Sequence, residues 1–192
     1  MGNPHCNKAK VKDPSGGPGM VTKATCEAYF AIMETGLVAG KVQCFSERPG
    51  ESATGDHPDG RACDISVDDA DPAAVEQGER LASWIAKYHQ QLRLGDGYVL
   101  FNHKSSSGNK DWPSTLSWYD SPEFGCFGAT PMPLEKAQKI ADASGMNLDK
   151  SQKTLCHYDH IHVSILGTTG AANNVSYRST RAADRYPRIR NR

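Results

Sequence analysis

The chain has 192 residues, and its 22 basic and 22 acidic side chains give a net charge of zero. This length fits one ordinary domain with a core of its own. The balanced charge argues against a nucleic-acid-binding protein, and no run of 18 apolar residues is present to span a membrane. The modest hydrophobic content of 38%, with 18 glycines and 11 prolines, predicts a loop-rich α+β protein.

Hydrophobic spacing, together with start and stop signals, predicts both helices and strands. Thr22 or Thr25 can cap the first helix, and Asp71 followed by proline can begin the second. In chain order, we expect a helix over 22–36, strands over 41–45 and 61–67, a helix over 72–91, a strand over 97–102, an irregular stretch over 103–131, a helix over 133–144 and a strand over 160–166.

These elements predict a single small α+β domain over residues 21–167. We expect a central antiparallel sheet that carries the functional site, flanked by the helices 22–36 and 72–91. An irregular arm of residues 1–20 precedes the domain and a basic tail of residues 168–192 follows it. The tail can track an anionic wall polymer or can be a solvated flexible end. We expect the protein to be a monomer.

Six cysteines are scattered along the chain without a CxxC pair, so a zinc ribbon and a thioredoxin-type motif are both excluded. An even number suits up to three disulfides and an oxidising compartment. Against this, residues 1–20 lack the apolar stretch of a signal peptide. A leader that is not part of this chain, export by another route, and a cytoplasmic protein with free thiols are the three explanations. We favour the first and expect a secreted or wall-associated protein. Cys63 is expected in the core or in a disulfide, and a Cys126–Cys156 bridge is a further possibility.

The segment HPDGRACD, residues 57–64, places a histidine at the end of a turn and an aspartate in the strand that follows. Such a turn can bring the side chains of His57 and Asp64 to one point, and Gly60 allows the turn to be tight. Imidazole nitrogen and carboxylate oxygen are both ordinary zinc ligands. Taken alone, a surface turn followed by a capping aspartate explains this segment equally well.

The segment HYDHIHVS, residues 157–164, holds three of the seven histidines. On a strand, His160 and His162 point to the same face, so they can serve one metal ion or divide metal binding and proton transfer between them. His5, His89 and His103 have no motif around them and are expected on the surface. Two histidines and one aspartate would leave a fourth position open, which is the pattern of catalytic zinc.

The two segments together resemble the LAS-type zinc peptidases, which include lysostaphin-type enzymes, D-Ala-D-Ala peptidases and Hedgehog-like domains. The chain is most similar to actinobacterial secreted domains of this type. The motifs that carry the resemblance are SERPG at 46–50, HPDGRACD at 57–64, YVLFN at 98–102 and HYDHIHVS at 157–164. The resemblance covers residues 20–166.

The resemblance implies a role for individual residues. His57, Asp64 and His162 match the three ligands of one Zn²⁺ ion. His160 matches an unliganded catalytic histidine, and His157 matches a further active-site histidine of the penicillin-insensitive murein endopeptidases. Arg48 matches an arginine that in the D-Ala-D-Ala peptidases contacts substrate near the zinc, where it can stabilise negative charge on the carbonyl oxygen.

Two positions depart from the family pattern. Gly55 stands where a supporting serine usually precedes the first histidine. Asp159 stands where the D-Ala-D-Ala peptidases have a glutamate, and strand alternation predicts that it faces away from His160. The general base is therefore expected to be His160 or His157, and the sequence does not choose between them.

The histidine and aspartate motifs thus predict a zinc-dependent hydrolase, and the resemblance implies that it cleaves a peptide bond in peptidoglycan. Two alternatives remain open. One is a binding module that keeps the zinc and holds a wall fragment or a partner without cleaving it. The other is zinc hydrolysis of a different bond, such as an ester or an amide outside the wall.

Overall fold

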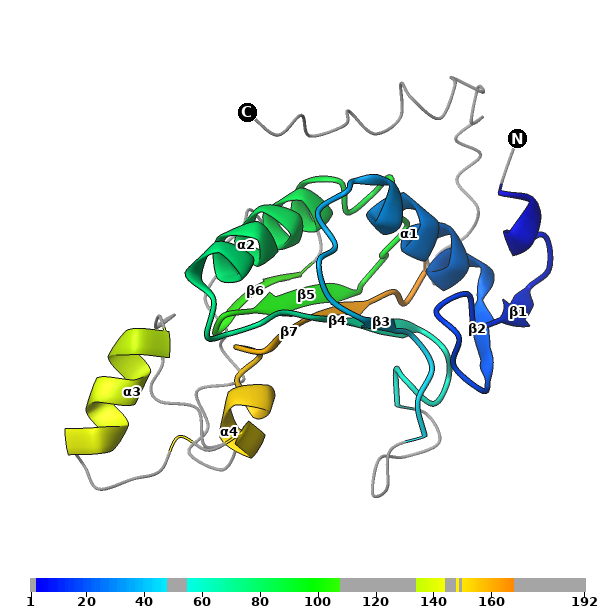
Figure 1. The fold of residues 1–192 in the computed structure, drawn as a ribbon. Coiled ribbons are helices and arrows are strands. Elements are labelled where there is room, and N and C mark those ends of the chain that lie inside the picture. Colours follow the sequence, from blue (N-terminus) through cyan, green and yellow to red (C-terminus); the bar gives the residue numbers. More distant parts are fainter. Residues whose placement is uncertain (1–2, 48–54, 108–133, 144–147, 149, 168–192) are drawn as a thin grey trace.

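The computed structural model describes residues 3–47, 55–107, 134–143, 148 and 150–167 (Figure 1). In chain order, the elements are the 3-10 helix η1 (Pro4–Cys6), β1 (Lys10–Lys12), β2 (Met20–Thr22), α1 (Lys23–Glu34), β3 (Val42–Gln43), β4 (Ala62–Ser66), α2 (Pro72–Lys87), β5 (Tyr98–Phe101), β6 (Lys104–Ser107), α3 (Leu134–Ala143), α4 (Lys150–Leu155) and β7 (His160–Ser164). This arrangement of helices and antiparallel strands confirms the small α+β fold.

The central sheet has five strands in the order β3-β4-β7-β5-β6, and every neighbouring pair is antiparallel. The last strand in sequence, β7, therefore lies in the middle, between β4 and β5. Its register places His162 directly opposite Asp64, a residue 98 positions earlier in the chain. The two segments that carry the sequence motifs are thus neighbouring strands.

Strand alternation separates the core from the candidate site. Ile65 of β4 and Ile161 of β7 are fully buried and belong to the same core cluster as Leu81 of α2. Helices α1 and α2 cover this apolar face (Figure 1). Asp64 and His162 alternate with these apolar residues and so lie on the other face. The sheet therefore supports a polar site with a packed core behind it.

Capping residues define where the two main helices begin, as the sequence predicts. The Thr22 side chain accepts a hydrogen bond from the backbone N–H of Thr25. The Asp71 side chain accepts one from the backbone N–H of Ala73. Helix α2 ends at Lys87 rather than at residue 91. Every helix within the described residues is too short or too polar to span a bilayer.

The N-terminal segment is more ordered than the expected irregular arm. Strand β1 pairs with β2, and the Cys6–Cys26 disulfide joins η1 to α1. Asp13 is buried, and its carboxylate accepts hydrogen bonds from the backbone of Ser15 and Phe45. The disulfide and the contact between Asp13 and Phe45 join residues far apart in the chain, so local sequence patterns do not reveal them. The basic tail over 168–192 lies outside the described residues.

The expected irregular stretch 103–131 begins with a strand instead. Strand β6 pairs with β5 through a tight turn in which Asn102 and His103 both adopt positive φ, at 48° and 59°. The serine-rich sequence of β6 hides this pairing, because a ladder uses backbone groups that every residue has. His103 and His89 are buried, which corrects the expectation that they lie on the surface. Residues 108–131 fall outside the described part.

Candidate metal centre

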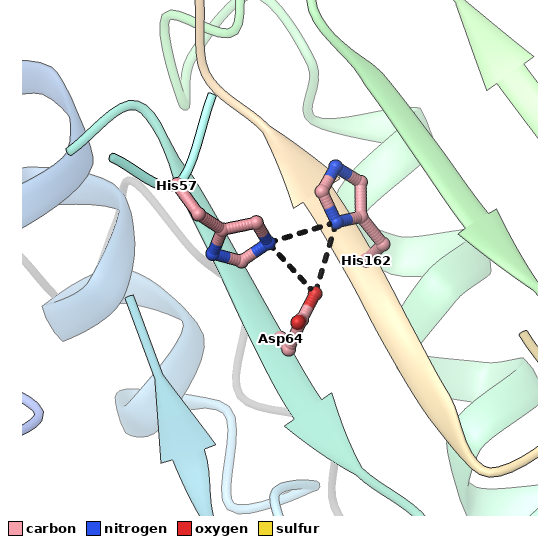
Figure 2. Close-up of side chains that lie close together, drawn as sticks. All are labelled: His57, Asp64 and His162. Carbon is pink, nitrogen blue, oxygen red and sulfur yellow. Dashed lines mark hydrogen bonds and ion pairs between the residues drawn. The ribbon is translucent and has the colours of Figure 1, made fainter. Parts of the chain in front are cut away.

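Three side chains converge on the polar face of the sheet: His57 from the turn before β4, Asp64 from β4 and His162 from β7 (Figure 2). Asp64 Oδ1 lies 2.9 Å from His162 Nδ1 and 3.2 Å from His57 Nε2, and the two ring nitrogens are 3.2 Å apart. The structure therefore brings together the three residues that the sequence singled out as ligands, and they can hold a metal ion.

The spacing of these three atoms fits a metal ion. Four ligands at zinc–nitrogen and zinc–oxygen bond lengths, arranged as a tetrahedron, lie about 3.3 Å from one another. The three observed separations fall between 2.9 and 3.2 Å. The donor set of two imidazoles and one carboxylate also suits a divalent transition metal.

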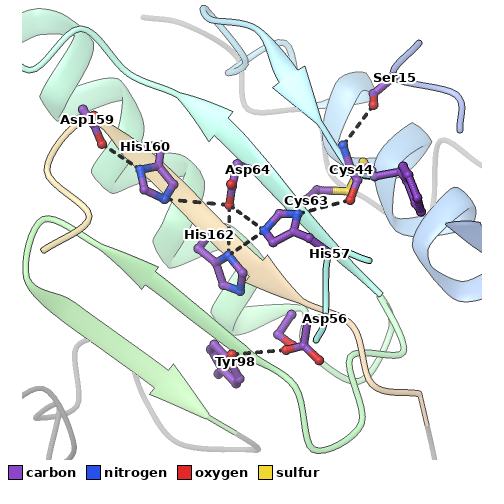
Figure 3. A network of polar contacts seen from close by, with 12 residues as sticks. Ser15, Cys44, Asp56, His57, Cys63, Asp64, Tyr98, Asp159, His160 and His162 are labelled. Carbon is purple, nitrogen blue, oxygen red and sulfur yellow. Dashed lines mark hydrogen bonds and ion pairs between the residues drawn. A yellow bond between two sulfur atoms is a disulfide. The ribbon is translucent and has the colours of Figure 1, made fainter. Parts of the chain in front are cut away.

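The His57 ring is oriented by the backbone of Cys44, at the end of the β3 segment. Because a carbonyl oxygen only accepts, His57 Nδ1 donates to the Cys44 carbonyl at 3.3 Å. This fixes the tautomer in which Nε2 has the free lone pair, and Nε2 is the atom that faces Asp64 and His162 (Figure 3). The ring is buried, with only 2% of the residue surface exposed.

The turn that carries His57 depends on Gly60. The Gly60 N–H donates to the His57 carbonyl at 3.0 Å, and Gly60 has a φ of +69°. A Cβ atom at this position would lie 2.2 Å from the backbone oxygen of Met20. The sequence-based expectation of a tight glycine turn is therefore confirmed, with a second reason for glycine in the close approach of β2.

Gly60→Ala is expected to destabilise the fold by about 2–4 kcal/mol, from left-handed strain plus a backbone collision. Gly36→Ala is the matched control, because Gly36 has a φ of +70° but open space around its Cβ position. That variant should lose only about 1–2 kcal/mol, the cost of the strain alone. Urea unfolding of both variants measures the difference, and equal losses would show that the Met20 contact has no cost.

The charges at the centre favour metal binding. Burial alone would raise the pKa of the Asp64 carboxyl, but its close contacts with the His162 and His57 rings outweigh burial and hold this pKa well below its ordinary value. Burial lowers the pKa of His162 below that of an exposed histidine. At neutral pH the site therefore presents a carboxylate and a neutral imidazole, the protonation states in which both groups bind metals.

His160 lies beside the three residues and is oriented by Asp159. Its Nε2 is 3.8 Å from Asp64 Oδ1, and its Nδ1 is 2.7 Å from Asp159 Oδ1 (Figure 3). A carboxylate accepts, so Nδ1 donates and Nε2 has the free lone pair. Thr154 donates in turn to the other Asp159 oxygen at 2.5 Å. The hydrogen bonds also keep the pKa of Asp159 below its ordinary value, although burial alone would raise it.

The contact between Asp159 and His160 corrects the expectation that Asp159 faces away. Strand β7 begins at His160, so strand alternation does not extend back to Asp159. The preceding segment turns, and the Asp159 side chain folds onto the ring of its neighbour. The two residues form an Asp–His pair in which the carboxylate fixes both the tautomer and the direction of the imidazole.

His157 completes the histidine cluster from a strained backbone position. Its φ is +56°, and its ring centroid lies 4.7 Å from that of His160 and 5.7 Å from that of His162. The backbone N–H of Asn102 donates to the His157 carbonyl at 2.6 Å, which fixes this residue to the β5–β6 turn. Burial, then the nearby histidines, lower the pKa of His157 well below its ordinary value.

Arg48, the predicted substrate contact, lies outside the described residues. The cysteine expectations are partly testable: Cys63 forms a disulfide with Cys44, as expected for a strand residue facing away from the site. Cys156 is also disulfide-bonded, and the described residues contain no free cysteine. Cys126 lies outside the described residues. The Cys44–Cys63 and Cys6–Cys26 bridges are compatible with an extracellular protein.

Three residues near the site have no counterpart among the sequence predictions. The Asp56 carboxylate accepts hydrogen bonds from the Tyr98 hydroxyl, at 3.2 Å, and from the Ser164 hydroxyl. The Tyr98 ring stacks on His162, with the centroids 5.5 Å apart. Ser164 shares a strand face with His160 and His162, a period-two signal that was available in the sequence. The sequence has no comparable signal for Asp56, whereas Tyr98 is the first residue of the YVLFN motif, for which the sequence predicted no role.

The fold and the site together define a small disulfide-bonded α+β protein with a candidate metal centre on one face of its sheet. A family model described as VldE, C-terminal domain, matches residues 17–121, more than half of the chain, and the chain therefore belongs to this family. The matched segment includes His57 and Asp64 but ends before β7 and His162. No curated protein and no solved structure matches the chain.

Proposed function

We propose that this protein is a secreted zinc-dependent hydrolase that cleaves a peptide bond in bacterial peptidoglycan. The observation that supports this most is the position of His160 beside a complete three-residue ligand set. Its Nε2 lone pair faces the ligand Asp64 at 3.8 Å, while Asp159 fixes the opposite side of the ring. A purely structural metal centre has no use for such a group, because its fourth position is filled by the protein.

When bound, zinc would polarise a substrate carbonyl and lower the pKa of a water molecule at the open position. His160 would accept the proton of the attacking water at Nε2 as the carbon–oxygen bond forms. It would return that proton to the amine as the carbon–nitrogen bond breaks. The hydroxyl of the water is then part of the new carboxyl group, and its proton is on the new amine. Asp159 stabilises the imidazolium that exists between these steps.

Zinc is proposed over iron for a chemical reason. Two histidines and one carboxylate are also the ligand set of non-haem iron oxygenases. A neighbouring histidine with a fixed tautomer and a free lone pair serves proton transfer, which hydrolysis of an amide requires at both of its stages. Peptidoglycan is proposed as the substrate because the four motifs resemble those of enzymes that cut it.

The test is the release of new amino groups from purified peptidoglycan by metal-free protein and by the same protein reloaded with zinc. We expect release only by the reloaded protein. Zinc binding and co-sedimentation with peptidoglycan, without amine release, would contradict the hydrolase and favour the binding module. Release from a simple ester or a non-wall amide, with none from peptidoglycan, would overturn the proposed substrate.

A further inference from the structure

One metal-binding histidine lacks the hydrogen bond that usually orients such a ligand. If His162 binds the metal through Nδ1, its Nε2 must carry the proton, and ligand histidines ordinarily donate that proton to a carboxylate or a carbonyl. His162 Nε2 is buried and has no hydrogen-bond partner within the described part of the chain. Some other contact must therefore set the direction of this ring.

The Tyr98 ring supplies that contact. It lies against the His162 ring with the centroids 5.5 Å apart and the planes within 25° of parallel. His57 meets the same imidazole edge-on, at 5.1 Å and 62°. Stacking on one face limits rotation of the imidazole about its side-chain bonds, so that Nδ1 stays directed at Asp64 and His57.

Tyr98 is itself held in place by Asp56. The Asp56 Oδ2 atom accepts from the Tyr98 hydroxyl at 3.2 Å (Figure 3). The same atom also accepts from the buried Ser164 hydroxyl. Ser164 is two residues beyond His162 on the same strand face. Asp56 therefore connects the ring that covers His162 to the strand that carries His162.

Asp56 also directly precedes the other histidine ligand, His57, in the chain. The turn that contains His57 is closed by a hydrogen bond from the backbone N–H of Arg61 to the backbone carbonyl of Asp56, at 2.7 Å. Asp56 thus holds the turn of one ligand through its backbone carbonyl and the packing of the other through its carboxylate. The geometry points to Asp56 and Tyr98 as a pair of positioning residues that align both histidine ligands for metal binding.

This inference rests on the proposed metal centre, and cobalt provides a test that does not depend on hydrolysis. Co²⁺ titration of the full chain gives a dissociation constant, and the visible absorption of bound Co²⁺ reports the geometry of its ligands. Tyr98→Leu is expected to weaken Co²⁺ binding by about 10- to 100-fold and to change the spectrum. Tyr98→Phe keeps the stacked ring and loses only the hydroxyl, so a smaller loss is expected.

A double-mutant cycle tests the connection between the two residues. Asp56→Ala and Tyr98→Phe break the same hydrogen bond, so their combined loss of affinity should be smaller than the sum of the single losses. Tyr29→Leu on α1 is the matched control and should bind Co²⁺ like the wild type. Thermal unfolding without metal shows whether each variant is folded. If Tyr98→Leu does not fold, the Co²⁺ affinity of Tyr98→Phe decides whether Tyr98 has the positioning role.

The outcomes separate this inference from the proposal beneath it. Wild-type affinity and an unchanged cobalt spectrum in Tyr98→Leu and Asp56→Ala would overturn the positioning role while leaving the metal centre intact. Fully additive losses in the cycle would also contradict it. A wild-type protein that binds no Co²⁺ would remove the metal centre itself, and the positioning role with it.

Discussion

His160→Ala is expected to lower the rate of peptide hydrolysis by about 10²- to 10⁴-fold, the usual contribution of a positioned general acid–base group. Metal binding should survive, because the three atoms that could hold the ion come from His57, Asp64 and His162. The physical reason is the His160 Nε2 lone pair beside Asp64, with the Asp159 carboxylate on the opposite side of the ring. Rates of amine release and metal content measured on the same preparations test both halves of this expectation.

The same experiment decides between the two histidines that the sequence left open. His157 is held by its backbone to the β5–β6 turn, whereas the Asp159 carboxylate orients the ring of His160. His157→Ala is therefore expected to lower the rate less than His160→Ala does. His5→Ala is the control, because His5 is exposed and distant in the chain from the histidine cluster, and this variant should keep the wild-type rate. Full activity in His160→Ala would remove His160 from the reaction, and loss of its metal would make it a ligand instead.

Removal of the Cys44–Cys63 disulfide should weaken both the fold and the metal centre. A bridge that closes a loop of this length contributes about 3 kcal/mol to the free energy of unfolding. Cys44 also supplies the carbonyl that orients His57, and Cys63 adjoins the candidate ligand Asp64. Cys44→Ala/Cys63→Ala is expected to bind zinc about 10- to 100-fold more weakly, the usual effect of losing an outer contact to a ligand.

The second disulfide offers a closely matched control. Cys6–Cys26 joins residues 20 apart, against 19 for Cys44–Cys63, but it lies between η1 and α1. Cys6→Ala/Cys26→Ala should lose similar stability and keep its zinc affinity. Urea unfolding and zinc titration at a temperature where both variants are folded separate the two effects. Equal zinc affinity in both double variants would show that the Cys44 carbonyl does not depend on its bridge.

The fold class was predictable from the sequence because the local signals agree. Thr22 and Asp71 are good helix caps, and both cap the helices that follow them. The alternation around Asp64 and His162 places each on the polar face of its own strand. The sequence could not show that these strands are neighbours, because the antiparallel register between β4 and β7 depends on the folding of the whole chain.

The parts that sequence reasoning missed depend on contacts between distant residues. Strand β6 has a serine-rich sequence with weak strand propensity and forms because β5 offers it a backbone ladder. Asp56 acts through the distant Tyr98, and no local pattern links the two. Asp159 was assigned to the wrong direction because strand alternation was extended one residue too far. Such errors occur at element ends, where a periodic pattern stops having meaning.

Metal content is the most direct measurement of the central claim, which is that His57, Asp64 and His162 form a metal centre. Purified wild type and His162→Ala, both checked for folding by circular dichroism, would be analysed by mass spectrometry after zinc loading and removal of excess metal. One zinc ion per wild-type chain, lost in the folded variant, is the result that these three residues predict. No zinc in the wild type, or equal zinc in both proteins, would contradict the claim.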